Sequence, residues 1–237
     1  MRPAPLVLLA TCAALGLGCQ ESGFDERRET ARPLKVQHLL GETKVPGQAE
    51  RPTTIGANVL DNTLALGITP LAAAVPGGRL PGYLGRPAAE VELLPDGEPP
   101  PPRTDVIVAA APVSDAEFLR LRGIAPTVVT DEGGVRWKLN LRLNGEALGR
   151  TNDAEALLSD YDERVAQVRR GLPQRVRVAV PGAGDESFAA SVLADAGVRR
   201  VAPDDAQARL EAPVWTGPGG VFAARAALAD LQRVLQR

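Results

Sequence analysis

The 237-residue chain has little of what most catalytic and metal sites require. Histidine occurs once, at His38, in a segment without the sharp turn that presents a nucleophilic serine. Cysteine occurs twice, at Cys12 and Cys19, close to the start of the chain. A Ser-His-Asp hydrolase would depend on His38 alone, and a metal cage of several imidazoles or thiolates is excluded. We therefore expect no enzyme, no catalytic residue, no metal ligand and no cofactor.

The charge pattern and the glycine loops disfavour two further classes of protein. The net charge is −2 and no basic tract is present, so a nucleic-acid partner has little support. No G-x-x-x-x-G-K-[ST] loop occurs. The glycines of GAGDES (182–187) follow a strand-like run, but no third glycine opens a helix, so they are a weak dinucleotide signal. With aromatic residues at only 3%, the core must consist mostly of Ala, Val and Leu.

The first residues are typical of an export signal. Arg2 precedes an apolar run over residues 6–17, and small residues stand before Cys19. LGLGC also resembles a lipobox, in which the cysteine becomes the lipidated first residue of the mature chain. The alternative is an ordinary cleaved signal with a chance cysteine. We expect a signal peptide at 1–19, lipidation at Cys19, a flexible tether at 20–34, and a periplasmic protein anchored to the membrane.

Residues 35–143 alternate between strand-like and helix-like segments. Ser114 and Glu117 have the spacing of a capping box at the start of one helix. Alternation of this kind predicts a parallel αβ lobe with right-handed crossovers. The predicted strands are 53–57, 70–78, 104–111 and 126–130, and the predicted helices are 58–67, with Asn58 as its cap, and 114–123.

The region 144–172 contains the most regular helical pattern. Apolar residues at Leu157, Tyr161, Val165, Val168 and Leu172 form one stripe from a predicted N-cap at residue 152. A helix of this length spans roughly 30 Å, enough to run along two lobes. The periodicity also allows an ordinary surface helix of one domain.

Residues 173–237 restart the αβ pattern in a shorter segment. We expect a strand at 175–182, a helix ending near 197, a strand at 198–202 and a last helix. Leu228, Leu231 and Leu235 lie on one face of that last helix. The predicted fold is α/β, with two αβ lobes joined by one long helix and a truncated second lobe.

Several segments carry a resemblance to a known family, in an order that spans most of the chain from residue 36. They are VQHLLGETKVPGQAERPTTIGANVLDNTLALGITPLAAAV, LPGYLG, LRGIAPTVV, WKLNLRLNGEALGRTNDAEALLSDYDERVAQVRRGL, SFAASVLADAGVRR and GPGGVFAARAALADLQRVL. Together they resemble the periplasmic substrate-binding proteins of ABC importers for ferric siderophores. That family has two αβ lobes joined by one long helix, with the ligand between them.

The resemblance implies a binding function without metal ligands from the protein, because the iron arrives wrapped in an organic chelator. It implies an iron chelate and an inner-membrane ABC permease as partners, and a cleft with aromatic walls and a few cations. Candidate ligand-binding residues are Tyr83, Arg86, Trp137 and Trp215. For each of them, packing or surface placement is the alternative.

One departure from the family leaves a second function open. Between residues 200 and 214 the chain lacks a strand and helices that the family has in its second lobe. The alternative function is a non-transporting interaction lipoprotein, derived from such a binder, whose pocket is lost or altered.

Overall fold

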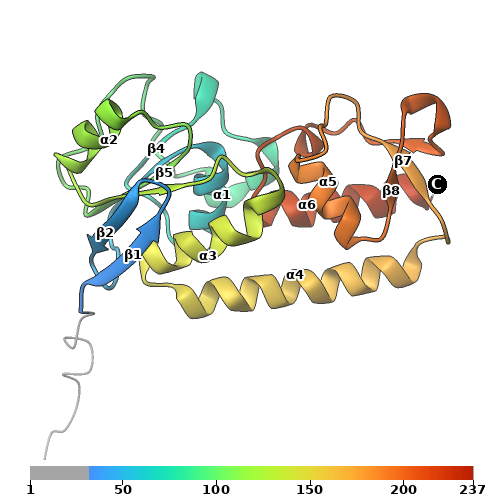
Figure 1. The fold of residues 1–237 in the computed structure, drawn as a ribbon, viewed down its shortest axis with the longest axis horizontal. Helices are drawn as coiled ribbons and strands as arrows, with labels where there is room; N and C mark the ends of the chain where they lie inside the picture. Colours follow the sequence, from blue (N-terminus) through green and yellow to red (C-terminus); the bar gives the residue numbers. More distant parts are fainter. Residues whose placement is uncertain (1–31, 237) are drawn as a thin grey trace, which may run out of the picture.

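The computed structural model describes residues 32–236. Cys19, the predicted signal peptide and most of the predicted tether lie outside these residues, so their roles stay predictions. Two separate regions of β-sheet lie toward opposite ends of an elongated molecule, and one long helix runs alongside both (Figure 1). The predicted two-lobed α/β fold is confirmed, whereas the boundaries at 35–143, 144–172 and 173–237 stay predictions.

A four-stranded parallel sheet forms the centre of the first lobe. Its strands are β3 (Pro52–Ile55), β4 (Ala72–Ala74), β5 (Val106–Ala110) and β6 (Thr127–Thr130), in the order β4-β3-β5-β6. The first four residues of β5 are buried, as a continuous apolar run predicts for a strand covered on both faces. Strands β4, β5 and β6 fall within segments predicted from the sequence, and β3 begins one residue before its predicted segment, 53–57.

The two crossover helices of this sheet begin differently. Helix α2 (Asp115–Arg122) is capped as predicted, because the Ser114 hydroxyl accepts a 3.2 Å hydrogen bond from the backbone N–H of Glu117. Helix α1 (Ala57–Ala65) begins one residue before the predicted cap Asn58, and no side chain caps it. Asn58 is instead buried inside the first turn, since α1 is covered by the sheet and by two other helices.

A hairpin that the sequence analysis did not predict precedes the sheet. Strands β1 (Leu34–His38) and β2 (Gly41–Val45) pair antiparallel. His38, the single histidine of the sequence, is half-buried here. Its Nε2 lies 2.9 Å from the Thr43 hydroxyl, and its ring meets that of Phe118 edge-on. These contacts give the single histidine a structural place in the first lobe.

Two successive helices lead out of the first lobe. Helix α3 (Trp137–Leu148) ends at Gly149, which adopts the left-handed conformation with φ 69°. A Cβ there would lie 2.1 Å from the carbonyl oxygen of Gly47, so only glycine fits. The following helix, α4 (Thr151–Gly171), confirms the predicted long helix, although the predicted cap at residue 152 is wrong and α4 has no side-chain cap.

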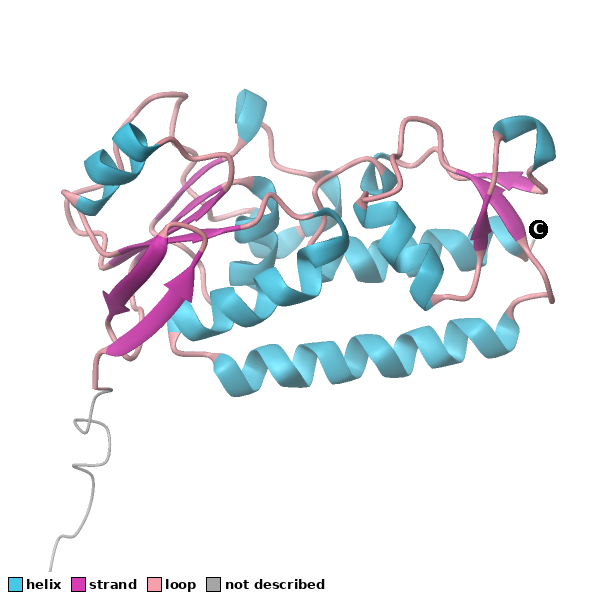
Figure 2. Ribbon diagram, in the orientation of Figure 1, coloured by secondary structure: helices cyan, strands magenta, loops and turns pink. Residues whose placement is uncertain are grey.

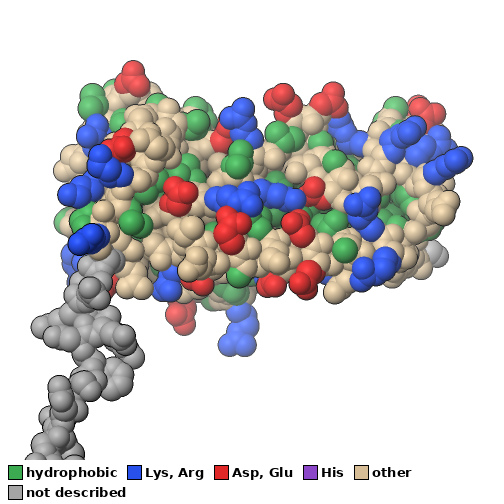
Figure 3. Space-filling model, turned by 60° about the horizontal axis from the view of Figure 1, so that its bottom comes forward, with side chains coloured by type: hydrophobic (Ala, Val, Ile, Leu, Met, Phe, Trp, Pro, Cys, Tyr) green, Lys and Arg blue, Asp and Glu red, His purple; other side chains and the backbone are tan. Residues whose placement is uncertain are grey.

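Helix α4 packs along both lobes. It lies against α3 of the first lobe and against α6 of the second, and the largest apolar cluster contains buried residues of both lobes. Its buried stripe consists of Ala154, Leu158, Tyr161, Val165 and Val168. The exposed residues of α4 carry both signs of charge, and the bottom view shows such mixed charge (Figure 3). Glu155 of α4 forms an ion pair with Arg142 of α3.

The second lobe is built on a small parallel sheet, with short strands and large helices (Figure 2). Its strands are β7 (Arg177–Ala179), β8 (Arg199–Arg200) and β9 (Ala208–Arg209), in the order β8-β7-β9. Its helices are α5 (Phe188–Asp195) and α6 (Val221–Leu235). β9 was not predicted. Short 3-10 helices η1 to η6 occupy Pro76–Gly78, Gly82–Leu84, Arg86–Ala88, Gly134–Arg136, Pro203–Asp205 and Pro213–Trp215.

Candidate functional site

A cavity of about 810 Å³ lies at the carboxyl ends of the first-lobe strands. Residues directly following β3 and β5 line it, among them Gly56, Asn58 and Ala111. These two strands are neighbours, but the chain leaves them toward opposite edges of the sheet, because β4 flanks β3 and β6 flanks β5. The gap between such strands is where open α/β sheets most often bind ligands. The cavity therefore occupies the position that the topology favours for a ligand.

The cavity wall is mainly apolar and contains no aromatic side chain among the described residues. Loops after β4 and before β5 complete it on one side, and α2 on the other. The apolar and proline residues that line it are Ile55, Ala57, Ala74, Val75, Pro76, Pro81, Leu94, Pro95, Pro100, Ala110, Ala111, Pro112, Leu121 and Pro218. None of the predicted aromatic residues lines this cavity.

The floor of the cavity depends on one glycine. Gly56 joins β3 to α1 with φ 113°, a conformation that L side chains rarely adopt. A Cβ on Gly56 would lie 2.7 Å from the Cβ of Ala110 at the end of β5. The absence of a side chain therefore lets the two strand ends approach and form a closed floor.

The start of α1 opens onto the same floor. Ala57 and Asn58 line the cavity, and no side chain accepts a hydrogen bond from the first turn of the helix. An uncapped helix start offers backbone N–H groups and a partial positive charge. The Asn58 side chain is held aside, because its Nδ2 donates to the carbonyl of Asp131 at 3.4 Å. The floor can therefore donate hydrogen bonds to oxygen atoms of a ligand.

Charged side chains lie around the apolar wall. Arg79, Asp96, Glu98 and Glu132 are exposed lining residues. Arg120 also lines the cavity and forms an ion pair of 3.9 Å with Glu117 on the same helix. The few cations expected from the sequence are present, but carboxylates outnumber them.

The second lobe contributes one residue, Pro218, to the cavity. The loop carrying Pro218 is fixed against the first lobe, since its carbonyl accepts a 3.2 Å hydrogen bond from the backbone N–H of Gly134. The Glu186 carbonyl accepts a similar bond from Val135. These hydrogen bonds join the two lobes beside the cavity. Most of the cavity wall nevertheless belongs to the first lobe.

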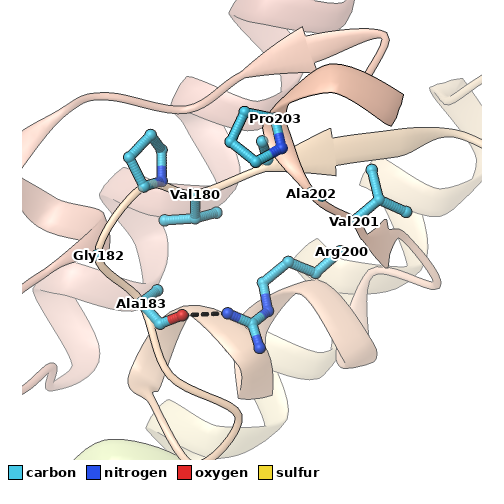
Figure 4. Close-up of a pocket in the computed structure, with 9 residues that line it drawn as sticks. Val180, Gly182, Ala183, Arg200, Val201, Ala202 and Pro203 are labelled. Carbon is cyan, nitrogen blue, oxygen red and sulfur yellow. Dashed lines mark hydrogen bonds between the residues drawn. The ribbon is translucent and has the colours of Figure 1, made fainter.

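A second cavity, of about 430 Å³, lies in the second lobe at the carboxyl ends of β7 and β8. Among residues 32–236, Arg200 is its only charged lining residue, and the guanidinium reaches across to the carbonyl of Ala183 (Figure 4). The same guanidinium pairs with Asp185. The loop after β7 already binds this guanidinium through Ala183 and Asp185. The smaller cavity is therefore a weaker candidate for a ligand site than the first-lobe cavity.

Two of the predicted binding residues lie in the core. Trp137 is 1% exposed and packs edge-on against Tyr161 and Phe188, at ring-centre distances of 4.9 and 6.1 Å. Trp215 is fully buried, and its Nε1 donates a 2.8 Å hydrogen bond to Asp230. Both tryptophans therefore pack in the core, which was the alternative to ligand binding, and neither lines the cavity.

Tyr83 and Arg86 lie beside the cavity without lining it. Both belong to the segment between β4 and β5, several residues of which line one wall. Arg86 is exposed, whereas the Tyr83 hydroxyl is buried without a hydrogen-bond partner, and burial raises the pKa of this phenol. Sequence reasoning missed Arg79, Gly56 and Glu132. A signal for Gly56 was present, because it lies near the end of the predicted strand 53–57.

The described residues contain no group of three or more His, Cys, Asp or Glu side chains placed to hold a metal ion. In the same part of the chain, no helix combines the length and apolarity needed to cross a membrane. A ligand of the first-lobe cavity would therefore meet mainly apolar surface, backbone donors and separated charges.

Comparison with known proteins gives consistent results. No protein-family model matches the sequence. The probable siderophore-binding lipoprotein YfiY of Bacillus subtilis is 24% identical over 174 residues, which cover 70% of this chain and 54% of YfiY. The structure of Staphylococcus aureus SirA complexed with staphyloferrin B has a TM-score of 0.68 at 19% identity, covering 84% of this chain and 97% of that chain. The chain shares the fold of SirA.

A periplasmic solute binding protein from Mycobacterium smegmatis shows the same likeness, with a TM-score of 0.70 at 19% identity over 86% of this chain and 98% of that chain. The fold of the periplasmic binding proteins, inferred from ordered sequence segments, is thereby confirmed. The chain spans about half the length of YfiY, 54%. What YfiY and SirA bind is a property of those proteins, and at these identities the likeness to solved structures concerns the fold.

Proposed function

We propose that the chain is an exported solute-binding protein that captures a ferric siderophore or similar iron chelate for an ABC importer. The observation that carries this proposal is the cavity of about 810 Å³ at the carboxyl ends of β3 and β5, in a fold shared with SirA bound to staphyloferrin B. The sequence likeness to the probable siderophore-binding lipoprotein YfiY supports the same ligand class.

The character of the cavity suits a ligand that brings its own metal coordination. A chelated ferric ion already has its oxygen ligands, so the protein needs only a shaped apolar wall and a few polar groups that fix orientation. The wall has six prolines, which are rigid and apolar, and the start of α1 supplies backbone donors. The cargo would be held by its organic surface.

The remaining parts of the proposal concern location and partners. Lipidation at Cys19 would anchor the chain to the membrane in the periplasm, and a permease would receive the chelate. The proteins it resembles are solute-binding proteins, and we propose binding without catalysis for this chain. We also propose that Arg86 and Tyr83 contact a ligand larger than the cavity, whereas Trp137 and Trp215 are left out because both rings are buried in the core.

Equilibrium dialysis of the purified full-length chain against ⁵⁵Fe-labelled chelates would test this function. The set should contain hydroxamate, catecholate and citrate complexes. We expect saturable binding of at least one complex at micromolar concentration or below. If none of them binds, and a partner protein is captured instead, the non-transporting interaction lipoprotein becomes the better explanation.

A matched pair of variants would locate the site. Ala74 lines the cavity, so Ala74→Phe should fill part of it and lower chelate affinity at least about tenfold, in line with loss of a shaped apolar contact. Ala116 is exposed on α2 and does not line the cavity, so Ala116→Phe should leave affinity unchanged. Thermal melts of both variants would verify that they fold. Equal affinities in the two folded variants would place the site elsewhere.

A further inference from the structure

The charges lining the first-lobe cavity are strongly unbalanced. Four carboxylates and two guanidinium groups line it, and the pair between Arg120 and Glu117 uses one of each. Among residues 32–236, the other lining charges have no ion-pair partner. They are Asp96, Glu98, Glu132 and Arg79. The cavity therefore presents an excess of unpaired negative charge to any ligand.

The floor of the cavity carries a positive charge that is smaller than the negative charge of the lining carboxylates. The uncapped start of α1 carries a partial positive charge of about half a unit and presents N–H donors at Ala57 and Asn58. Oxygen acceptors on a ligand can use these donors. Half a positive charge does not offset the excess carboxylates, so the field across the cavity stays negative while its deepest point favours oxygen atoms.

Solvent screening does not remove this field for a bound ligand. A cavity of about 810 Å³ is on the order of 12 Å across, so a bound complex lies within about one Debye length of every lining charge at physiological salt. Like charges brought this close disfavour binding, and a multiply charged ligand feels each of them.

Given the proposed function, on which this step rests, we infer that the cavity selects an oxygen-rich iron chelate of neutral or positive overall charge and discriminates against strongly anionic ones. Three hydroxamate groups neutralise a ferric ion, whereas three catecholate groups leave the complex triply negative. The tris-hydroxamate class is therefore the fitting cargo. Its carbonyl-type oxygens match the donors at the start of α1, and its neutral charge avoids repulsion by the lining carboxylates.

Titration calorimetry of the purified full-length chain with three ferric complexes would test the charge rule. The probes are a neutral tris-hydroxamate, a tris-hydroxamate with one free amine, and a tris-catecholate. Both hydroxamates should bind at least about tenfold more tightly than the tris-catecholate, and raising the salt concentration should narrow the gap. Equal or tighter binding of the tris-catecholate overturns the charge rule while leaving the proposed function intact. If none of the three complexes binds and citrate complexes also fail to bind, both the charge rule and the proposed function are wrong.

A triple variant assigns the discrimination to the cavity. Asp96→Asn, Glu98→Gln and Glu132→Gln together remove the unpaired lining carboxylates, and should raise the affinity for the tris-catecholate relative to that for the neutral complex by about tenfold or more. The matched control carries Glu146→Gln, Glu163→Gln and Asp205→Asn, which change the net charge equally at exposed positions outside the cavity. If both triple variants behave alike, only the overall protein charge matters and the inference fails.

Discussion

The carboxylate of Asp61, on α1 of the first lobe, accepts a 2.8 Å hydrogen bond from the backbone N–H of Phe222 at the start of α6. Its second oxygen accepts a 3.0 Å bond from Ala223. Asp61 therefore caps a second-lobe helix from the first lobe. A Cβ on Gly220 would lie 2.4 Å from the Asp61 side chain, so glycine at that position keeps the junction closed.

Stability should depend on pH through Asp61. Complete burial raises the pKa of this carboxyl to about 7, although the N–H groups of Phe222 and Ala223 and the nearby Arg225 lower it. Because the pKa of Asp61 in the folded state lies above the unfolded value of 3.8, the protonated side chain stabilises the fold. This contribution to the free energy of unfolding is fully present below about pH 4 and is lost as the pH rises toward 7.

The Asp61→Asn variant isolates this dependence, because Asn has the same shape and does not titrate. Relative to the variant, the native free energy of unfolding should fall by up to roughly 3 kcal/mol between about pH 5 and about pH 8. Urea unfolding at several pH values measures the difference. A difference that is flat with pH, or that grows as pH rises, contradicts the prediction.

A second contact between the lobes depends on Gly133. Its φ is 115°, and a Cβ there would lie 2.2 Å from the carbonyl oxygen of Pro218. Gly41 has nearly the same φ, 116°, with open space around it. Both Ala variants therefore share the backbone strain, but only Gly133→Ala adds a steric clash. We expect Gly133→Ala to be less stable than Gly41→Ala by at least about 2 kcal/mol in urea unfolding. Equal losses would mean that the loop moves away freely.

The two tyrosines offer a matched test of a buried hydroxyl. The Tyr161 hydroxyl donates a 2.9 Å hydrogen bond to Asp195, which also pairs with Lys138 at 3.0 Å. The Tyr83 hydroxyl is buried without a partner. Removing a satisfied group costs stability, whereas removing an unsatisfied one can be neutral or favourable.

Tyr161→Phe should therefore lower the free energy of unfolding by about 1 kcal/mol, and Tyr83→Phe should leave it unchanged or raise it slightly. Chemical denaturation gives both values. If Tyr83→Phe also weakens chelate binding while stability holds, Tyr83 takes part in ligand binding, as proposed. A larger stability loss at Tyr83 than at Tyr161 would contradict the hydrogen-bond assignment.

Some parts of this fold could be read from sequence because local patterns determine them. The long apolar periodicity located α4, and a continuous apolar run located β5. The first turn of α4 could not be predicted, because Gly149 and its close approach to Gly47 fix where the helix starts. The β1–β2 hairpin was missed because its burial comes from distant partners such as Phe118.

The site was less predictable than the fold for a related reason. Aromatic residues are natural candidates for a ligand wall, but the sequence does not say which face of a helix or loop turns inward. Trp137 and Trp215 turn into the core, where their rings replace the bulk that Ala and Val cannot supply. The strand-end position of Gly56 was readable, since ligands of parallel sheets gather at carboxyl ends. The unpaired carboxylates required the loops to be placed in space.

Substituting the tryptophans should separate stability from binding. Trp215→Phe removes the hydrogen bond to Asp230, and Trp137→Phe removes packing against Tyr161, so each should lower the free energy of unfolding by about 1–3 kcal/mol. Because neither ring lines the cavity, the Kd for the chelate should stay within about twofold of the native value. The control replaces Arg79, an exposed lining residue, with glutamine. Arg79→Gln should lower the affinity for anionic chelates, with almost no effect on stability. Calorimetry and urea unfolding on the same samples give both quantities. A tenfold affinity loss in a tryptophan variant that stays folded would return that ring to the binding site.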